Sequence, residues 1–268
     1  MSDELAITKP AERSLHVQVY EPEESGVASK LPPVLLIHGY ASSGELNWNR
    51  SGWTSALTNA GRLVITIDLP GHGLSEAPED DSDFRPSAIC NAFSRILTGI
   101  FETYDSSQEL EPKVDVVGYS LGSRLAWEFA ATYPELVRRL VLGAPNRNDP
   151  FADFDLEAAQ RNVTDDEIVD DPTTAEFLRM GRVGAGDRIS ELLRMIRQFQ
   201  LEPFRPGDTV PQSPALLVAG ESDHLAESMP ELAALIPNHE VIWLPARNHT
   251  NAVSSRLFKN AVISFLSR

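Results

Sequence analysis

Residues 113–130 constrain the fold of this chain more than any other stretch. A largely β-branched run over residues 114–117 leads into Gly118-Tyr-Ser120-Leu-Gly122, and the residues behind it repeat apolar side chains four apart. This pattern predicts a strand, a sharp turn and a helix. Because glycines on both sides let the backbone bend, we expect the hydroxyl of Ser120 to stand clear of the sheet edge as a nucleophile.

Strand-like runs alternate with helix-like stretches along most of the sequence. The first expected strand, residues 14–20, alternates apolar and polar side chains, as a half-buried strand near a sheet edge does. The later runs are mostly apolar, which is typical of strands covered on both faces. They cover residues 33–37, 63–67, 113–117, 137–142, 214–220 and 240–244. The alternation predicts the α/β class, with a mostly parallel, doubly wound sheet.

Residues 146–211 interrupt this rhythm, because they contain helical patterns and no strand-like run. We therefore expect a core domain over residues 1–145 and 212–268, with a helical lid (cap) inserted over residues 146–211. One lid helix, capped by Asp187, should turn its apolar side toward a pocket and form the roof. That side carries Leu192, Leu193, Ile196 and Phe199.

The predicted lid is strongly acidic. Eleven acidic residues and three arginines give residues 149–187 a net charge of −8, half of the −16 of the whole chain. Most of this charge is expected on a solvated outer face, but any part that faces the pocket entrance would disfavour anionic substrates. We therefore expect a substrate with a neutral, mainly apolar acyl or alcohol portion.

Composition limits the partners and the chemistry. The formal charge of −16 repels phosphate backbones and anionic lipid surfaces, so we expect no nucleic-acid or membrane partner. Cys90 is the only cysteine, which excludes an internal disulfide and a cysteine-cluster metal site. No apolar run approaches the ~18 residues that a membrane span needs. We expect a cytoplasmic protein, a monomer or weak homo-oligomer, that acts on a small-molecule substrate.

Residues that could take part in catalysis follow the ends of five expected strands. They are residues 38–40 (His-Gly-Tyr), Asp68, Ser120, Asp223 and His249. In an open parallel sheet, ligands bind beyond the carboxyl ends of the strands. A serine hydroxyl needs an imidazole to take its proton, and the imidazole needs a carboxylate to fix its tautomer. Ser120, Asp223 and His249 supply these groups in the order serine, acid, histidine.

With this order of groups, the chain resembles the α/β-hydrolase fold superfamily over nearly its whole length, in its serine-nucleophile, esterase-like branch. The resemblance implies a catalytic triad in which Ser120 is the nucleophile, His249 the general base and then acid, and Asp223 the orienting acid. It implies a helical lid inserted after the sixth strand, and a reaction that needs neither a metal nor an organic cofactor.

An oxyanion forms when the serine attacks, and it needs two hydrogen-bond donors. The backbone N–H of Leu121, directly after the nucleophile, is expected to be one of them. By resemblance, the other is the backbone N–H of Tyr40, the residue that follows His38 and Gly39. The sequence therefore indicates an oxyanion hole between the first apolar strand and the start of the helix behind Ser120.

Two features of the predicted triad stay open. Glu221 and Asp149 are alternatives to Asp223 as the acid, since some relatives place the acid after the preceding strand. Asn248 precedes His249 where many relatives have glycine, so the shape of that loop is not fixed by the resemblance.

The expected function is that of a carboxylesterase-like serine hydrolase, which forms an acyl-serine intermediate on a small, neutral, mainly apolar ester. A carbon–carbon bond hydrolase acting on a diketone would use the same triad. A ligand-binding or receptor-type protein would keep the triad and turn over slowly. Serine at position 120 argues against the related enzymes that use an aspartate nucleophile.

Overall fold

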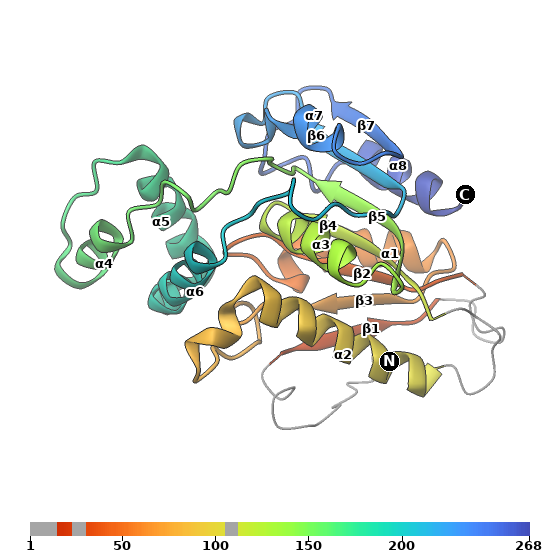
Figure 1. Cartoon of the computed structure of the whole chain (residues 1–268), viewed down its shortest axis with the longest axis horizontal. Coiled ribbons are helices and arrows are strands. Elements are labelled where there is room, and N and C mark those ends of the chain that lie inside the picture. Colours follow the sequence, from red (N-terminus) through yellow and green to blue (C-terminus); the bar gives the residue numbers. More distant parts are fainter. Residues whose placement is uncertain (1–14, 23–30, 105–111) are drawn as a thin grey trace.

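The computed structural model describes residues 15–22, 31–104 and 112–268, and a seven-stranded sheet forms the centre of this part of the chain (Figure 1). The strands are β1 (Val17–Tyr20), β2 (Val34–Ile37), β3 (Val64–Ile67), β4 (Val114–Tyr119), β5 (Val137–Gly143), β6 (Ala215–Gly220) and β7 (His239–Leu244). Their order is β1-β3-β2-β4-β5-β6-β7; β1 runs antiparallel to β3 and all other pairs are parallel. The predicted α/β class with a mostly parallel sheet is confirmed.

Helices lie on both faces of this sheet and in a segment that extends away from it (Figure 1). They are α1 (Trp53–Thr58), α2 (Pro86–Tyr104), α3 (Leu121–Thr132), α4 (Leu156–Asp165), α5 (Pro172–Ala185), α6 (Ile189–Leu201), α7 (Met229–Ala233) and α8 (Arg256–Leu266). Short helical turns are η1 (Glu45–Asn49), η2 (Asp81–Phe84), η3 (Gly186–Arg188) and η4 (His224–Ala226). Figure 1 places α2 and α3 on one face of the sheet and α1 and α8 on the other.

Because helices pack on both faces of the sheet, the side chains of its inner strands are mostly apolar. On one face Phe93 of α2 packs edge to face on Phe129 of α3, with ring centroids 6.0 Å apart. On the other, Trp53 of α1 meets Phe258 of α8 at 4.9 Å. Every residue of β2 and β3 is buried between these layers, whereas β1 at the edge is half-buried, as its alternating sequence predicts.

Helices α4, α5 and α6 form the segment between β5 and β6, which we call the helical segment (residues 146–211). It extends to the left in Figure 1, away from the layers around the sheet. The sequence analysis expected it after the sixth strand, and this is wrong: it follows the fifth strand of the described chain. A count of six would need one more strand ahead of it, and the described residues contain none. The division into two domains stays a prediction.

The structure of α6 confirms one expectation and corrects another. Leu192, Leu193, Ile196 and Phe199 are buried, as their spacing predicts. Asp187 does not cap this helix: it lies inside η3, and the N-cap position belongs to Arg188 without a side-chain hydrogen bond. The short 3-10 turn η3 therefore joins α5 to α6 where the cap was expected.

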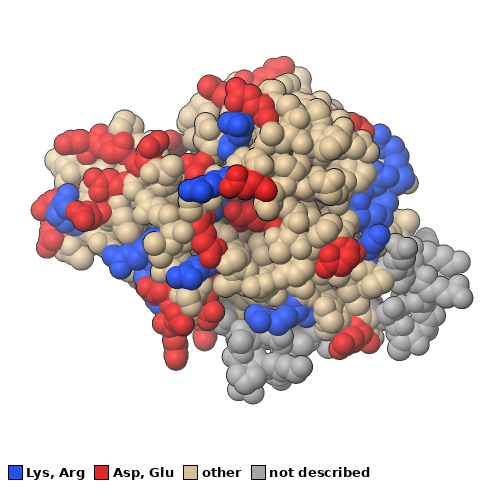
Figure 2. Space-filling view, in the orientation of Figure 1, with Lys and Arg blue, Asp and Glu red and all other residues tan. Residues whose placement is uncertain are grey.

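Acidic side chains gather on the outside of the helical segment. Figure 2 shows them over the left part of the molecule, in the orientation of Figure 1. The exposed ones include Asp153, Glu157, Asp165, Asp166, Glu167 and Asp170. Most of the charge of this segment thus faces solvent.

Within the described ranges, no helix combines the length and the apolar character that crossing a membrane requires.

Candidate active site

Ser120 sits in a strained turn between β4 and α3. Its φ of 54° and ψ of −117° lie outside the regions that non-glycine residues usually adopt. A Cβ at Gly118 would come within 2.1 Å of the carbonyl oxygen of Gly122, and a Cβ at Gly122 within 2.1 Å of that of Ile37. Only glycine fits at both positions, so these residues hold the serine at the tip of the turn, as the sequence predicts.

His249 and Asp223 reach Ser120 from two other strand ends. Asp223 follows β6 and His249 lies in the loop after β7. Nε2 of His249 is 2.8 Å from Oγ of Ser120, and Nδ1 is 2.9 Å and 3.1 Å from the two carboxylate oxygens of Asp223. The hydroxyl of Tyr119 donates to the carbonyl of His249 over 2.6 Å and fixes that loop. The three side chains form one hydrogen-bonded chain, and their catalytic roles stay predictions.

The two alternative acids lie elsewhere. Glu221 is exposed. Asp149 pairs with Arg124, 3.1 Å away, and does not contact the imidazole of His249. The acid that the imidazole contacts is therefore Asp223.

Asn248, the departure from the usual glycine, has a structural role of its own. Its side-chain oxygen accepts hydrogen bonds from the backbone N–H groups of Thr250 and Asn251, each 3.1 Å long. The side chain of Asn251 in turn accepts from the N–H of Asn248 over 3.0 Å. These local bonds close the loop that carries His249, so asparagine shapes the turn by hydrogen bonding.

The two predicted oxyanion donors flank Ser120. The turn after β2 lies directly beside it, since a Cβ at Gly39 would be 3.3 Å from that of Ser120. Tyr40 follows in this turn, and Leu121 opens α3. Among the described residues, neither backbone N–H has a hydrogen-bond acceptor. Both N–H groups are therefore unpaired in this part of the chain, and their role as oxyanion donors stays a prediction.

Buried polar groups below this turn hold it in shape. Asp68 accepts from the N–H of Gly44 over 2.6 Å and from that of Leu74 over 2.8 Å. His38 accepts the N–H of Leu69 on Nε2 over 2.9 Å, and its Nδ1 lies 2.8 Å from the carbonyl of Gly39. Burial lowers the pKa of His38 to about 4, so it stays neutral and serves as a structural group.

A cavity of about 200 Å³ opens over Ser120 and His249. Its apolar lining comes from the helical segment and its flanks: Phe151, Phe177, Met180, Phe204 and Leu225. The sequence analysis expected the apolar side of α6 to form the roof, and this is wrong. Phe199 of α6 packs behind Phe151, at a centroid distance of 5.7 Å, and contributes no surface to the cavity.

Comparison with known proteins shows the family to which the chain belongs. Residues 32–171 match the family model described as the alpha/beta hydrolase fold. The chain belongs to this family. As an α/β hydrolase, it is 27% identical over 265 residues to a Bacillus subtilis (strain 168) protein provisionally named 2-succinyl-6-hydroxy-2,4-cyclohexadiene-1-carboxylate synthase, with 87% of this chain and 90% of that protein covered.

Two further proteins are similar to this chain. The chain is 29% identical over 176 residues to the 2-hydroxy-6-oxononadienedioate/2-hydroxy-6-oxononatrienedioate hydrolase of Burkholderia vietnamiensis, covering 63% of this chain and 54% of that one. The solved structure of MenH from S. aureus is similar with a TM-score of 0.68 at 20% identity, over 94% and 97% of the two chains. Other curated relatives are longer, and the chain spans 30% of their length.

Arg124 is a charged residue of this hydrolase's cavity that the sequence analysis missed. Its guanidinium lies 3.1 Å from Asp149 and 3.2 Å from Glu128, and stacks on the ring of Phe199 at 4.8 Å. Burial raises the pKa of Glu128 to about 7. The sequence could have indicated that Arg124 lies at the cavity, because position 124 is one helical turn after Ser120 and on the same face of the helix.

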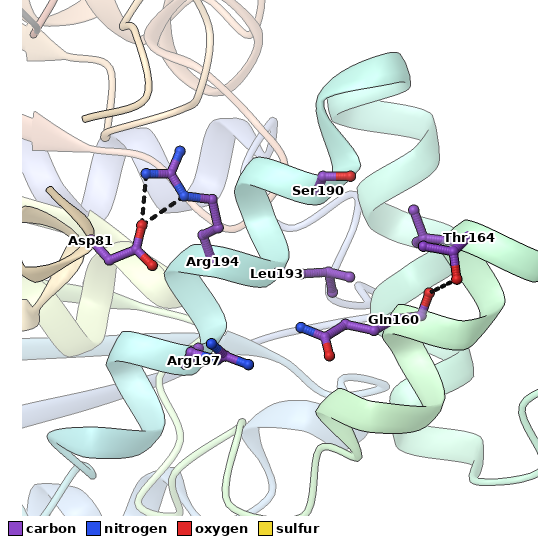
Figure 3. A pocket seen from close by; sticks show the side chains of 8 residues that line it. Asp81, Gln160, Thr164, Ser190, Leu193, Arg194 and Arg197 are labelled. Atoms are coloured by element: carbon purple, nitrogen blue, oxygen red, sulfur yellow. Dashed lines mark hydrogen bonds and ion pairs between the residues drawn. The ribbon is translucent and has the colours of Figure 1, made fainter. Parts of the chain in front are cut away.

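A second cavity, of about 390 Å³, lies between α4 and α6 away from the serine. Figure 3 shows Arg194 directed at Asp81, to which it is bonded over 2.7 Å, while Gln160 and Arg197 extend into the space between the helices. The residues that line this cavity include no histidine or cysteine. In the part of the chain that the structure describes, no group of three or more potential metal ligands occurs.

Proposed function

We propose that this α/β hydrolase cleaves small carboxylic esters through an acyl intermediate on Ser120. The observation that carries the proposal is the hydrogen-bonded chain from Ser120 through His249 to Asp223 at the floor of a cavity. A serine next to a carboxylate-oriented imidazole is the arrangement that activates a hydroxyl for attack on a carbonyl.

The reaction follows from these positions. Nε2 of His249 takes the proton of Ser120 as Oγ attacks the ester carbonyl, while Asp223 stabilises the imidazolium that forms. The backbone N–H groups of Tyr40 and Leu121 bind the oxyanion. The imidazolium then gives its proton to the leaving alcohol. Water, deprotonated by the same imidazole, releases the acid and restores the serine.

The cavity supports a small substrate. Its volume of about 200 Å³ lies below the usual range for sites that hold drug-sized ligands, roughly 300 to 1,000 Å³. Aromatic and aliphatic side chains form much of the lining. An acyl group of a few carbons would fill this space.

Charge in the cavity favours a neutral substrate. Arg124 is the basic residue of the lining, and its charge is matched by Asp149, which lies in the same wall. Asp153 also lines the cavity and forms no ion pair within the described residues. An anionic acyl group would therefore meet an uncompensated carboxylate at the cavity.

The test is a series of p-nitrophenyl esters from acetyl to dodecanoyl, with wild type compared with Ser120→Ala. We expect turnover of the short esters to fall at least about 10⁴-fold in Ser120→Ala. Ser190→Ala, at an exposed serine of α6, is the matched control and should keep the wild-type rate. Equal turnover in Ser120→Ala and wild type would overturn the proposal, and stoichiometric binding without turnover would favour a receptor-type protein.

A second candidate function is carbon–carbon bond hydrolysis of a diketone with the same triad. The observation that favours it is the likeness to the Burkholderia hydrolase, which is named for hydroxy-oxo-dioate substrates. Against it stand the acidic groups of the cavity, since a dioate carries two negative charges. Cleavage of a vinylogous diketone with no turnover of any ester would favour this candidate over the esterase.

A further inference from the structure

Tyr40 is a buried tyrosine whose hydroxyl has no hydrogen-bond partner among the described residues. It lines the cavity with Ser120 and is 5% exposed. Buried tyrosine hydroxyls usually have a partner, because an unpaired group loses its bonds to water without replacement. The hydroxyl of Tyr119, which is 4% exposed, donates to the carbonyl of His249 over 2.6 Å. Of the two similarly buried tyrosines in the site, Tyr119 therefore has a hydrogen-bond partner for its hydroxyl and Tyr40 has none among the described residues.

No side chain packed on Tyr40 accepts a hydrogen bond from its hydroxyl. The imidazole of His72 meets its ring edge to face at a centroid distance of 6.3 Å, but among the described residues neither Nε2 of His72 nor the tyrosine hydroxyl has a partner. Its ring meets Phe151 and Phe177 edge to face, with centroids 5.9 Å and 5.4 Å apart. Beside the hydroxyl oxygen lies Gly181 of α5, where an added Cβ would stand 2.9 Å away. The same Cβ would stand 2.3 Å from Cδ1 of Ile189, so glycine is what lets α5 approach the hydroxyl this closely. Burial raises the pKa of Tyr40, so the group is a protonated donor at neutral pH.

We propose that Tyr40 forms a polar subsite, in which its hydroxyl donates a hydrogen bond to a keto or ether oxygen that the substrate carries a few bonds from the reacting carbonyl. The subsite rests on the esterase function proposed above. The backbone N–H of Tyr40 belongs to the oxyanion hole, so one residue binds two oxygens of one substrate. For a wholly apolar substrate, phenylalanine at this position would serve equally well. A substrate that supplies a hydrogen-bond acceptor explains why the residue is tyrosine.

The experiment compares esters that differ by one acceptor oxygen. The pairs are p-nitrophenyl 4-oxopentanoate with p-nitrophenyl pentanoate, and 2-methoxyethyl butanoate with butyl butanoate. For wild type we expect a higher kcat/KM for the oxygen-bearing ester in at least one pair. In Tyr40→Phe, the ratio of the two kcat/KM values should fall about tenfold, the usual contribution of one hydrogen bond.

Tyr119→Phe is the matched control, because it removes the other buried hydroxyl, which supports the loop of His249. It should lower both members of a pair together and leave their ratio at the wild-type value. A ratio that is the same in wild type and Tyr40→Phe for both pairs would overturn the subsite while leaving the esterase proposal intact.

A binding measurement separates failure of the subsite from failure of the esterase function. Calorimetric titration of Ser120→Ala with the same four esters reports affinity without turnover. The subsite predicts tighter binding of an oxygen-bearing ester, and loss of that difference in Ser120→Ala combined with Tyr40→Phe. If wild type hydrolyses none of the esters, this difference still decides the subsite: its presence supports Tyr40 as a donor and its absence overturns it.

Discussion

Arg124 and Asp149 form an ion pair 3.1 Å long that joins the helix behind Ser120 to the loop where the helical segment begins. The side chains of both residues are largely buried, 3% and 6% exposed. Asp149 also accepts the backbone N–H groups of Phe151 and Phe204, at 3.0 Å and 2.8 Å, and both of these rings line the cavity. One carboxylate thus ties two walls of the cavity to the element that carries Ser120.

Removing this carboxylate should destabilise the fold. In Asp149→Asn, the buried Arg124 loses its main counter-charge, and we expect the free energy of unfolding to fall by about 3 kcal/mol. Urea denaturation measures it. Asp153→Asn, on the same loop but exposed, is the control and should stay within about 0.5 kcal/mol of wild type. Equal stability of the two variants would contradict a structural role for the ion pair.

The acid of the triad can be identified by two neighbouring substitutions. Asp223→Asn keeps the shape of the side chain but favours the wrong tautomer of His249, so kcat should fall by about 10⁴-fold. Glu221→Gln changes an exposed acid two residues away and should leave kcat close to wild type. Steady-state kinetics on one short ester decides between them, and the reverse order of effects would make Glu221 the acid.

The turn at Ser120 predicts a large effect of a single methyl group. Gly122→Ala places a Cβ 2.1 Å from the carbonyl oxygen of Ile37, so the turn at Ser120 must shift. A displacement of about 1 Å at a reacting group typically lowers the rate about 100-fold, and we expect at least this loss in kcat/KM. Gly207→Ala, with nothing within 4 Å of the added Cβ, is the matched control. Normal activity in Gly122→Ala would show that the turn is not constrained as described.

His38 gives a prediction for the pH dependence of stability. Its pKa is lowered from 6.5 to about 4 in the folded chain, so between these values the unfolded state binds more protons. Stability should therefore decrease as the pH falls from about 6.5 to about 4, by up to about 3 kcal/mol from this group. Urea denaturation across this range measures the loss.

The substitution that isolates this effect is His38→Gln, which should be less stable than wild type at neutral pH but lose less on acidification. His224→Gln is the control, since the side chain of His224 is 66% exposed, and it should follow the wild-type profile. A profile of His38→Gln parallel to wild type would mean that another group is responsible for the acid sensitivity.

The sequence predicted those parts of the molecule that local patterns determine. Ser120 could be found because glycines that only a tight turn requires stand on both sides of it. Asp223 and His249 could be found because each follows a strand of a parallel sheet, and such strand ends meet at one edge. The edge strand β1 was predicted from its alternating side chains.

Features that depend on how helices pack against one another could not be predicted. The apolar side of α6 was recognised, but its rotation toward Phe151 rather than the cavity depends on the partner helices. The sequence could not tell that the imidazole of His249 contacts Asp223, while Asp149 is paired with Arg124. The unpaired hydroxyl of Tyr40 likewise depends on which residue of α5 lies above it, here Gly181.

The central claim is an acyl group on Ser120, and mass spectrometry of the enzyme quenched in acid during turnover of a short p-nitrophenyl ester tests it most directly. The account predicts a mass increase equal to the acyl group, located by peptide mapping on the peptide that contains Ser120 and absent from Ser120→Ala. An acyl group found on another residue, or undiminished turnover by Ser120→Ala, would contradict it.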